Sequence, residues 1–442
     1  MRITIGYEIQ GNVAVREAML DLRGGDVIGI FGKCGSTTVK QLITSLSDLS
    51  EEITSTVILD SEGTLRNLKA LNEYRYTVLG WNASLPLIEV IPPGKDLSSR
   101  LLMVTDIIAA ALNLSDIEAH ILHNALMKYL TSSSHELDNL MKALSEEYMK
   151  LSPVERTRAY NILSLMRDLK YGRLGATFSE LHHTVNLEES MLYVDTALIP
   201  PSYRPLILSL LMYYLYSRGA RGKIIVILNF GTYLSDVSMR SKSFSTLLTT
   251  LLINNVTVIH SNSILELPTY LREYITYIIQ HRVNTSTEAR ALADFYKLPE
   301  ETLTKLRDHE AYLVGRGLCL KIALWHDIVE ELPTSRLPRE LLTPREPAAQ
   351  PLIREVFGDR AELVYEVLNY LRRGAVTRDE LLSFLTEGMG LDTTSAAKLI
   401  NELCVHGLVE DFIARDGRYW IRLSIRGLVS VDEYEEWRAR ET

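Results

Sequence analysis

Residues 27–39 read Val-Ile-Gly-Ile-Phe-Gly-Lys-Cys-Gly-Ser-Thr-Thr-Val and are the most informative segment of the chain for its fold class. An apolar run leads into a glycine-rich turn and then into Val39-Lys40-Gln41-Leu42-Ile43, which suits a helix. A phosphate-binding loop, G-x-x-x-x-G-K-[ST], follows the same course. Its N–H groups cradle phosphate oxygens, its lysine neutralises the β- and γ-phosphates, and its hydroxyl holds Mg²⁺. The stretch therefore predicts a strand, a phosphate-loop-like turn and a helix.

The positions that carry the chemistry of such a loop hold other residues. Counted from Gly32, the second glycine of this motif is replaced by Thr37, the lysine by Thr38 and the Ser/Thr by Val39. Phosphoryl transfer depends on positioning and charge neutralisation, so these losses argue against a working kinase or ATPase. Lys33, inside the loop, is the alternative donor.

Two readings of the turn are open. In the first, residues 32–39 wrap toward the helix N-terminus, where N–H groups and the helix dipole can hold an anion weakly. In the second, the glycines are accidental and the segment is an ordinary strand-to-helix turn. The order of elements further along the chain favours the first reading.

Composition describes an ordinary globular protein. With 442 residues, 46% of them hydrophobic and 23% charged, the chain is long enough for two or three domains. No apolar run approaches the roughly 18 residues that span a bilayer, and no signal peptide is recognisable, so we expect a cytoplasmic protein without membrane insertion. The three cysteines and the histidine pairs show no metal-ligand spacing, so no metal is expected. The net charge of −9 requires any nucleic-acid contact to come from a local patch.

Apolar strands alternate with helical segments from residue 27 to residue 280, interrupted by a helical stretch at about 101–185. This alternation predicts an α/β fold with a mainly parallel sheet covered on both faces. Ligands of such sheets lie beyond the carboxyl ends of the strands, where the loop, Asp60, Asn229 and Asn262 would converge.

The chain resembles the HerA/FtsK superfamily of DNA-pumping ATPases, and within it the HerA and type IV secretion (conjugation) branch. Residues 32–36 match the family's G-K-T-G-S-G-K-S up to the serine, and residues 59–64 resemble its D-x-x-G-E segment. Residues 111–122 resemble the entry to its helical insertion, and residues 194–228 the approach to its Walker B strand. The resemblance implies a RecA-like P-loop NTPase core over residues 1–330.

The departures from the family pattern fall on catalytic positions. Asn229-Phe230 stands where the family has the Asp-Glu pair, Asn262 where it has a sensor glutamine, and Thr64 where it has a glutamate. The resemblance thus implies a degenerate member with no catalytic residues and a vestigial nucleotide site. That site comprises Gly32, Lys33, Gly35, Ser36, Thr37, Thr38, Asp60, Asn229 and Asn262. Structural alternatives are that Asp60 caps an Asx turn and that Asn229 satisfies a strand end. Arg282, near a position for a trans-acting arginine, is more simply an exposed side chain.

The composition changes after the core. Residues 331–351 carry five prolines and are expected to form a linker. Residues 352–428 read as three helices, one opened by Thr377 with Glu380 three positions on, followed by a hairpin, which is typical of a winged helix. Residues 429–442 form a tail. Candidate DNA contacts in this domain are Lys398, Arg415, Arg418 and Arg422, although many winged helices dock proteins instead.

Two functions follow. The favoured one is a structural or adaptor subunit of a DNA-handling assembly, without cofactor, associating with itself or with an active relative and touching double-stranded DNA or protein through its winged helix. The alternative is an active DNA translocase that uses ATP with Mg²⁺ and relies on Lys33 or on a cation from a neighbouring subunit. Nucleotide binding without turnover lies between the two.

Overall fold

The computed structural model describes most of the chain. The described residues are 1–10, 13–49, 55–92, 94, 96–132, 134–152, 155–156, 159–170, 172–179, 183–325, 328–332, 351–413, 419–424, 427, 430–431, 433–435 and 437–438. Most of the predicted linker, 333–350, and much of the predicted tail therefore lie outside the described residues. The chain forms two compact units: unit 1 holds residues 1–147 and 161–342, and unit 2 holds residues 148–160 and 343–442.

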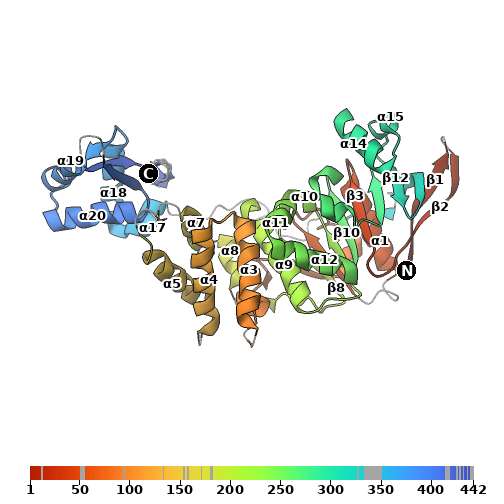
Figure 1. Ribbon diagram of the computed structural model, residues 1–442, viewed down its shortest axis with the longest axis horizontal. Helices are drawn as coiled ribbons and strands as arrows, with labels where there is room; N and C mark the ends of the chain where they lie inside the picture. Colours follow the sequence, from red (N-terminus) through yellow and green to blue (C-terminus); the bar gives the residue numbers. More distant parts are fainter. Residues whose placement is uncertain are drawn as a thin grey trace. The chain divides into compact units, whose positions relative to one another are not determined.

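Unit 1 is built around an eleven-stranded sheet with the order β2-β1-β13-β12-β11-β3-β10-β9-β4-β8-β5 (Figure 1). The seven strands from β11 to β5 are parallel, and β12, β13, β1 and β2 extend the sheet in antiparallel fashion. The strands are β1 Arg2–Gln10, β2 Val13–Asp21, β3 Val27–Phe31, β4 Thr56–Asp60, β5 Arg75–Val78, β8 Met191–Asp195, β9 Ile224–Ile227, β10 Val256–Ser261, β11 Tyr277–Gln280, β12 Glu310–Gly315 and β13 Leu318–Leu324. The predicted mainly parallel sheet is confirmed.

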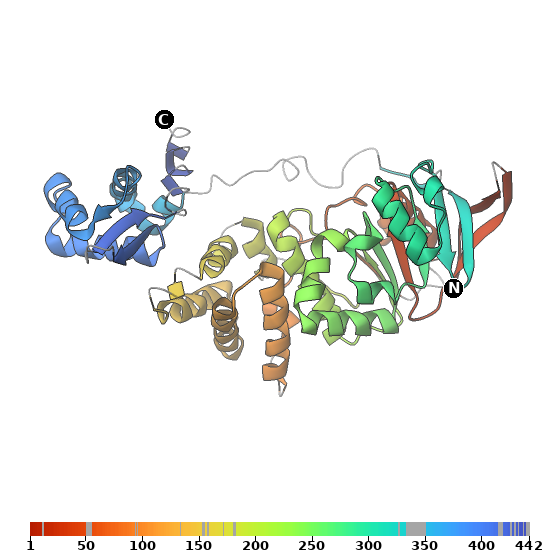
Figure 2. The ribbon, with the colours of Figure 1, turned by 45° about the horizontal axis from the view of Figure 1, so that its top comes forward.

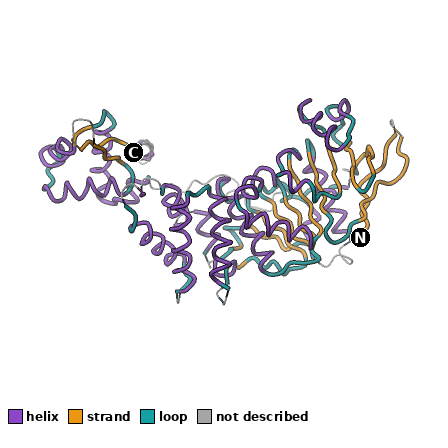
Figure 3. The backbone as a smooth tube through the Cα atoms, viewed as in Figure 1, coloured by secondary structure: helices purple, strands orange, loops and turns teal. Residues whose placement is uncertain are grey.

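Helices cover both faces of this sheet (Figure 3). Strands β3, β4 and β9 are buried along their whole length, which explains their continuous apolar sequences. Helix α1, Gly35–Asp48, connects β3 to β4, whereas α9, Arg204–Ser217, and α12, Lys242–Asn254, connect strands that progress in the opposite direction along the sheet. Since such crossovers are right-handed, α1 lies on one face and α9 and α12 on the other.

The predicted helical insertion lies between β5 and β8, coloured orange to yellow in Figures 1 and 2. It contains α3 Leu97–Leu112, α4 Asp116–Thr131, α5 Leu137–Met149, α7 Tyr160–Lys170 and α8 Gly172–Phe178. Helix α3 packs on α9 and α12, so α9 is buried almost all round. Helix α4 begins at a capping box formed by Ser115 and Glu118. Among the described residues, none of the helices combines the length and the apolar character needed to cross a bilayer.

Unit 2 contains the helices and the hairpin that the sequence predicts. Its elements are α17 Leu352–Phe357, α18 Ala361–Leu371, β14 Val376–Thr377, α19 Arg378–Ser383, a π-helical turn Phe384–Gly388, α20 Thr393–Val405, β15 Val409–Ile413 and β16 Tyr419–Leu423. Thr377 and Glu380 form the expected capping box. The three strands pair in the order β14-β16-β15 around one apolar core. The assignment of this unit as a winged helix remains our interpretation of these elements.

Candidate functional site

The carboxyl ends of the parallel strands bring the predicted site residues to one edge of the sheet. Phe31, which precedes the loop, lies beside Ser261 of β10 and Gln280 of β11. On the other side of β9, Asp60 lies beside Asp195 of β8. The loop, the end of β9 and the end of β4 thus face the same edge, as the order of elements predicted.

The loop itself is shorter than we predicted. Helix α1 already begins at Gly35, so the expectation that residues 32–39 form a loop is wrong for residues 35–39. Cys34 ends the turn in the left-handed conformation, with φ of 74°. Only Lys33 and Cys34 separate Gly32 from Gly35, whereas the motif has four residues between its glycines. If Gly35, the first residue of α1, is taken as the motif's last glycine, the turn is two residues shorter than the motif.

Five N–H groups of this turn and of the start of α1 have acceptors within the protein. Gly32 N–H donates to Asn262 O at 3.0 Å, and Lys33 N–H donates to Arg282 O at 3.0 Å. Inside the turn, the N–H groups of Gly35, Thr37 and Thr38 donate to the carbonyl oxygens of Gly32, Cys34 and Cys34, at 3.1, 3.1 and 3.4 Å. A phosphate cradle needs such donors to point at the ligand. These five N–H groups are hydrogen-bonded within the protein instead.

Gly32 is required by this arrangement, and its replacement gives a first prediction. Its φ is +91°, and an added Cβ would lie 2.8 Å from Arg282 O. We expect Gly32→Ala to lower the free energy of unfolding by about 2–3 kcal/mol, because backbone strain and a backbone clash add. Gly219→Ala is the matched control, since φ is +68° there but nothing lies within 4 Å of the added Cβ. It is expected to cost about 1 kcal/mol in urea unfolding. Equal losses of unfolding free energy in Gly32→Ala and Gly219→Ala would contradict a clash at Gly32.

The residues counted as replacements of the lysine and the metal hydroxyl face the core. Thr38 and Val39 are buried, and Thr38 Oγ1 lies 2.8 Å from His281 Nε2. Lys33 is exposed, and Ser36 and Thr37 are half-buried at the start of α1. Counting back from the helix, Gly35-Ser36-Thr37 takes the place of G-K-[ST], so the lysine position holds a serine in this frame as well.

His260 fills the space between the loop and the end of β9. Its ring lies so close to Gly35 that an added Cβ there would be 3.0 Å from the ring carbon Cδ2. On its other side, Asn229 N–H donates to His260 Nδ1 at 3.4 Å, which leaves the ring proton on Nε2. Burial lowers the pKa of His260 to about 4, so the ring is neutral at physiological pH. A neutral imidazole thus lies between the first residue of α1 and the residue that follows β9.

The buried imidazole predicts a pH dependence of stability. An unfolded histidine has a pKa of about 6.5 and the folded one about 4, so the unfolded chain binds the proton more tightly. Stability from this group is complete above pH 6.5 and is lost as the pH falls toward 4, by about 3 kcal/mol. Urea unfolding at pH 7 and at pH 4 measures the loss of unfolding free energy between the two pH values, and we expect His260→Leu to remove the part of this loss that is due to the ring. Replacing the exposed His309 by Leu should leave the loss unchanged. An unchanged pH dependence in His260→Leu would show that this ring is not the cause.

Asp60 has a structural role, in line with the simpler of its two interpretations. It is fully buried and accepts hydrogen bonds from Glu62 N–H at 3.1 Å, which forms the Asx turn, and from Leu65 N–H at 2.8 Å. Tyr193 also donates to it, at 2.9 Å. Burial and the neighbouring Asp195 raise the pKa of Asp60. The Asn229 side chain donates to Ser61 Oγ at 3.3 Å, so it too is held by protein groups.

Three further polar groups at this edge escaped the sequence analysis. Arg66 and Asp195 form an ion pair of 2.8 Å in which Asp195 is completely buried. Glu266 accepts a hydrogen bond from Ser261 Oγ and lies against Gly231, just beyond Asn229. None of these residues belongs to a motif, and only the fold brings them together. Within the described ranges, no three His, Cys, Asp or Glu side chains are grouped as a metal site would require.

The remaining predicted residues lie as follows. Arg282 is paired with Asp308 at 3.2 Å, and burial, followed by Asp308, raises the pKa of the Cys34 thiol. The Asn262 side chain is exposed. In unit 2, Arg422 is paired with Glu410 at 2.7 Å and Lys398 is exposed on α20. Arg415 and Arg418 lie outside the described residues.

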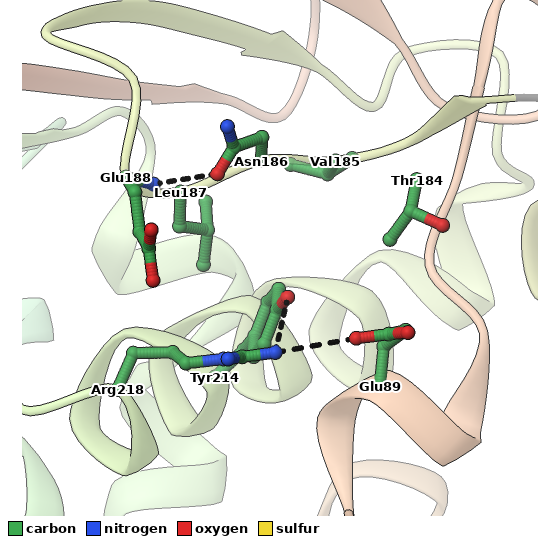
Figure 4. A pocket seen from close by; sticks show the side chains of 8 residues that line it. All are labelled: Glu89, Thr184, Val185, Asn186, Leu187, Glu188, Tyr214 and Arg218. Atoms are coloured by element: carbon green, nitrogen blue, oxygen red, sulfur yellow. Dashed lines mark hydrogen bonds and ion pairs between the residues drawn. The ribbon is translucent and has the colours of Figure 1, made fainter.

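The pocket in Figure 4 is distant from this edge. It has a volume of about 270 Å³ and is lined by Glu89, Thr184 to Glu188, Tyr214 and Arg218. Residues 184–188 lead into the start of β8, and Arg218 follows the end of α9, so the pocket lies at the amino ends of the strands. Arg218 Nη2 donates hydrogen bonds to a Glu89 carboxylate oxygen and to Tyr214 OH, both at 3.2 Å. Neither this pocket nor the other two described ones is lined by residues 32–38.

Comparison with known proteins finds relatives only among solved structures. No protein-family model matches the sequence, and no curated protein matches it. VirB4 of Thermoanaerobacter pseudethanolicus is 14% identical with a TM-score of 0.56, over 75% of this chain and 97% of that chain. The plasmid coupling protein TrwB in complex with a non-hydrolysable GTP analogue is 12% identical with a TM-score of 0.52, over 71% and 88%. TrwB in complex with ADP and Mg²⁺ gives the same identity and TM-score over 76% and 97%.

Proposed function

We propose that this chain, which has the fold of the HerA/FtsK-like P-loop superfamily, is a catalytically degenerate member that acts as a structural or adaptor subunit. The observation that carries the proposal is the position of His260, whose ring contacts both Gly35 and Asn229. A neutral ring there takes the volume of a ligand and offers phosphate no charge. This arrangement supports a site that the protein itself fills.

The fold relatives suggest the setting in which such a subunit acts. TrwB is a bacterial conjugative coupling protein, and one of its solved structures is a complex with ADP and Mg²⁺. This chain shares that fold but has Asn229-Phe230 where the family pattern has the acidic pair. We infer a scaffold in a DNA-translocating or DNA-processing assembly, in contact with further copies of itself or with an active relative. Double-stranded DNA is a candidate partner for unit 2.

A second candidate function, an active translocase with a divergent site, has two observations in its favour. The Lys33 side chain is exposed at the turn, and Glu266 brings a carboxylate next to Gly231, near the missing Walker B acids. A lysine and a carboxylate are the groups that phosphoryl transfer needs. In such a translocase, Lys33 and Glu266 would have to reach the nucleotide past the ring of His260.

Titration calorimetry distinguishes the two candidates. We expect the full-length protein to give no binding heat with ATP and Mg²⁺. Its variant His260→Ala, in which the space between Gly35 and Asn229 is open, is the companion sample. Heat in the wild type that Lys33→Ala removes would favour the translocase. Heat that appears only in His260→Ala would support a site closed by the imidazole.

A further inference from the structure

Unit 2 contains a groove that the nucleotide site does not explain. It has a volume of about 620 Å³ and lies between the end of α18, helix α19 and the π-helical turn that follows it. Its lining includes Tyr370, Phe384 and Gly388, together with the acidic residues Asp379, Glu380 and Glu387. All of these residues belong to unit 2, so the groove is complete within one compact unit.

The floor of the groove is a stacked aromatic pair. The rings of Tyr370 and Phe384 are parallel within 6°, with centroids 4.0 Å apart. Both side chains are half-buried, so ring surface remains accessible. Gly388 keeps the ring uncovered, because a Cβ added there would lie 3.4 Å from Phe384 Cδ2. The π-helical turn thus places a residue without a side chain beside an aromatic face.

The rim of the groove is acidic. Asp379, Glu380 and Glu387 are all exposed, and Glu380 also accepts a hydrogen bond from Thr377 N–H at 2.8 Å in the capping box. The surroundings have the same sign, since residues 351–413 carry eleven acidic and six basic side chains. This potential repels phosphate groups and attracts cationic ones.

We propose that this groove binds a basic segment of a partner protein. An arginine or lysine side chain would lie over the Phe384 ring, while Asp379 and Glu387 accept hydrogen bonds from its cationic head. Arginine fits best, because its planar guanidinium stacks on aromatic faces and forms charge-assisted hydrogen bonds with carboxylates. Charge complementarity selects this occupant over DNA, whose backbone would meet three exposed carboxylates at the rim.

This inference rests on the proposed adaptor function, which requires a docking surface, yet the two tests fail independently. Nucleotide binding is measured at residues 32–38 of unit 1, and partner binding at residues 370–388 of unit 2. If the protein binds ATP as well as the basic peptide, the proposed groove stands and the proposal of a degenerate nucleotide site fails. If it binds neither, only the proposed groove fails.

Fluorescence anisotropy with the full-length protein tests the groove. The probe is a fluorescein-labelled peptide in which arginines alternate with alanine and leucine. A peptide with glutamine for arginine and a labelled DNA duplex serve as comparisons. We expect binding of the arginine peptide only, weakened roughly tenfold in the double variant Asp379→Asn, Glu387→Gln by the loss of two charge-assisted contacts. Glu366→Gln, exposed on α18 but outside the groove, is the matched control and should change the affinity less than about twofold.

A steric variant completes the test. Gly388→Leu fills the groove, and no positive φ opposes a side chain at this position, so we expect a folded protein without peptide binding. Phe384→Leu keeps the apolar volume but removes the ring face, and should weaken binding severalfold. Equal binding of the arginine and glutamine peptides, or unchanged binding in both the charge variant and Gly388→Leu, would overturn the proposal. Duplex binding without peptide binding would make unit 2 a DNA reader instead.

Discussion

Mixed with ATP and Mg²⁺, with or without duplex DNA, the purified protein is expected to release phosphate no faster than the uncatalysed reaction. Removing a single preorganised donor from a transition state costs roughly 3–4 kcal/mol, and each ~1.4 kcal/mol is tenfold in rate. This chain lacks the lysine, the Walker B acid and the catalytic carboxylate at their usual positions. The combined loss therefore amounts to many orders of magnitude. A phosphate-release assay at micromolar protein measures it.

The controls for this assay follow from the site. Lys33→Ala should be indistinguishable from wild type, because no turnover exists for it to remove. Asn229→Asp, which restores one acid, should also be inactive, since His260 still contacts Gly35. DNA-stimulated turnover that Lys33→Ala abolishes would refute the degenerate site and establish the translocase.

The variant Arg66→Met is expected to lose about 3–5 kcal/mol of unfolding free energy. Arg66 is paired with Asp195, which is completely buried and lies beside Asp60, a second buried carboxyl. Removing the guanidinium leaves Asp195 without its cation in a medium of low dielectric, which is the costly way to break a buried pair. Urea unfolding of the full-length protein at pH 7, followed by circular dichroism, gives the difference.

Arg75→Met is the matched control for this variant. Arg75 pairs with Glu189 at 2.7 Å, but its side chain is 51% exposed, so the expected loss is below about 1 kcal/mol. The double variant Arg66→Met, Asp195→Leu should recover part of the loss, because no unpaired charge remains. A cost for Arg66→Met equal to that of Arg75→Met would contradict the buried-pair argument.

The sheet could be predicted from the sequence because its parallel strands are buried on both faces. Val27–Phe31 and Ile224–Ile227 are continuous apolar runs, and such runs between helical segments leave few other arrangements. The Asx turn of Asp60 was also foreseeable, since it needs only one side chain and the N–H group two residues on. The hairpin of β15 and β16 was likewise readable from a local turn signal.

The site could not be read in the same way, because its geometry depends on contacts between distant segments. Where the loop ends is set by Cys34 in a left-handed conformation and by Lys33 N–H bonding to Arg282 O. Neither feature leaves a mark in the sequence. His260 was not recognisable as a filler of the site, since a histidine in an apolar strand looks like an ordinary core residue. Its role emerges only when Gly35 and Asn229 lie on either side of it.

The pairing of β1 with β13 has a consequence for biosynthesis. Gly6 of β1 lies beside Leu324, so the first strand finds its partner more than three hundred residues later. At about 5–20 residues per second, the ribosome needs roughly 15–60 s to deliver that partner. During this interval the edge of β1 that later pairs with β13 is an unsatisfied template in the nascent chain. On its other edge β1 pairs with β2, and the register of that pair shifts between Thr4 and Gly6. This topology therefore requires that the unpaired edge of β1 be protected during translation, for example by chaperones, and this requirement is separate from the stability of the folded protein.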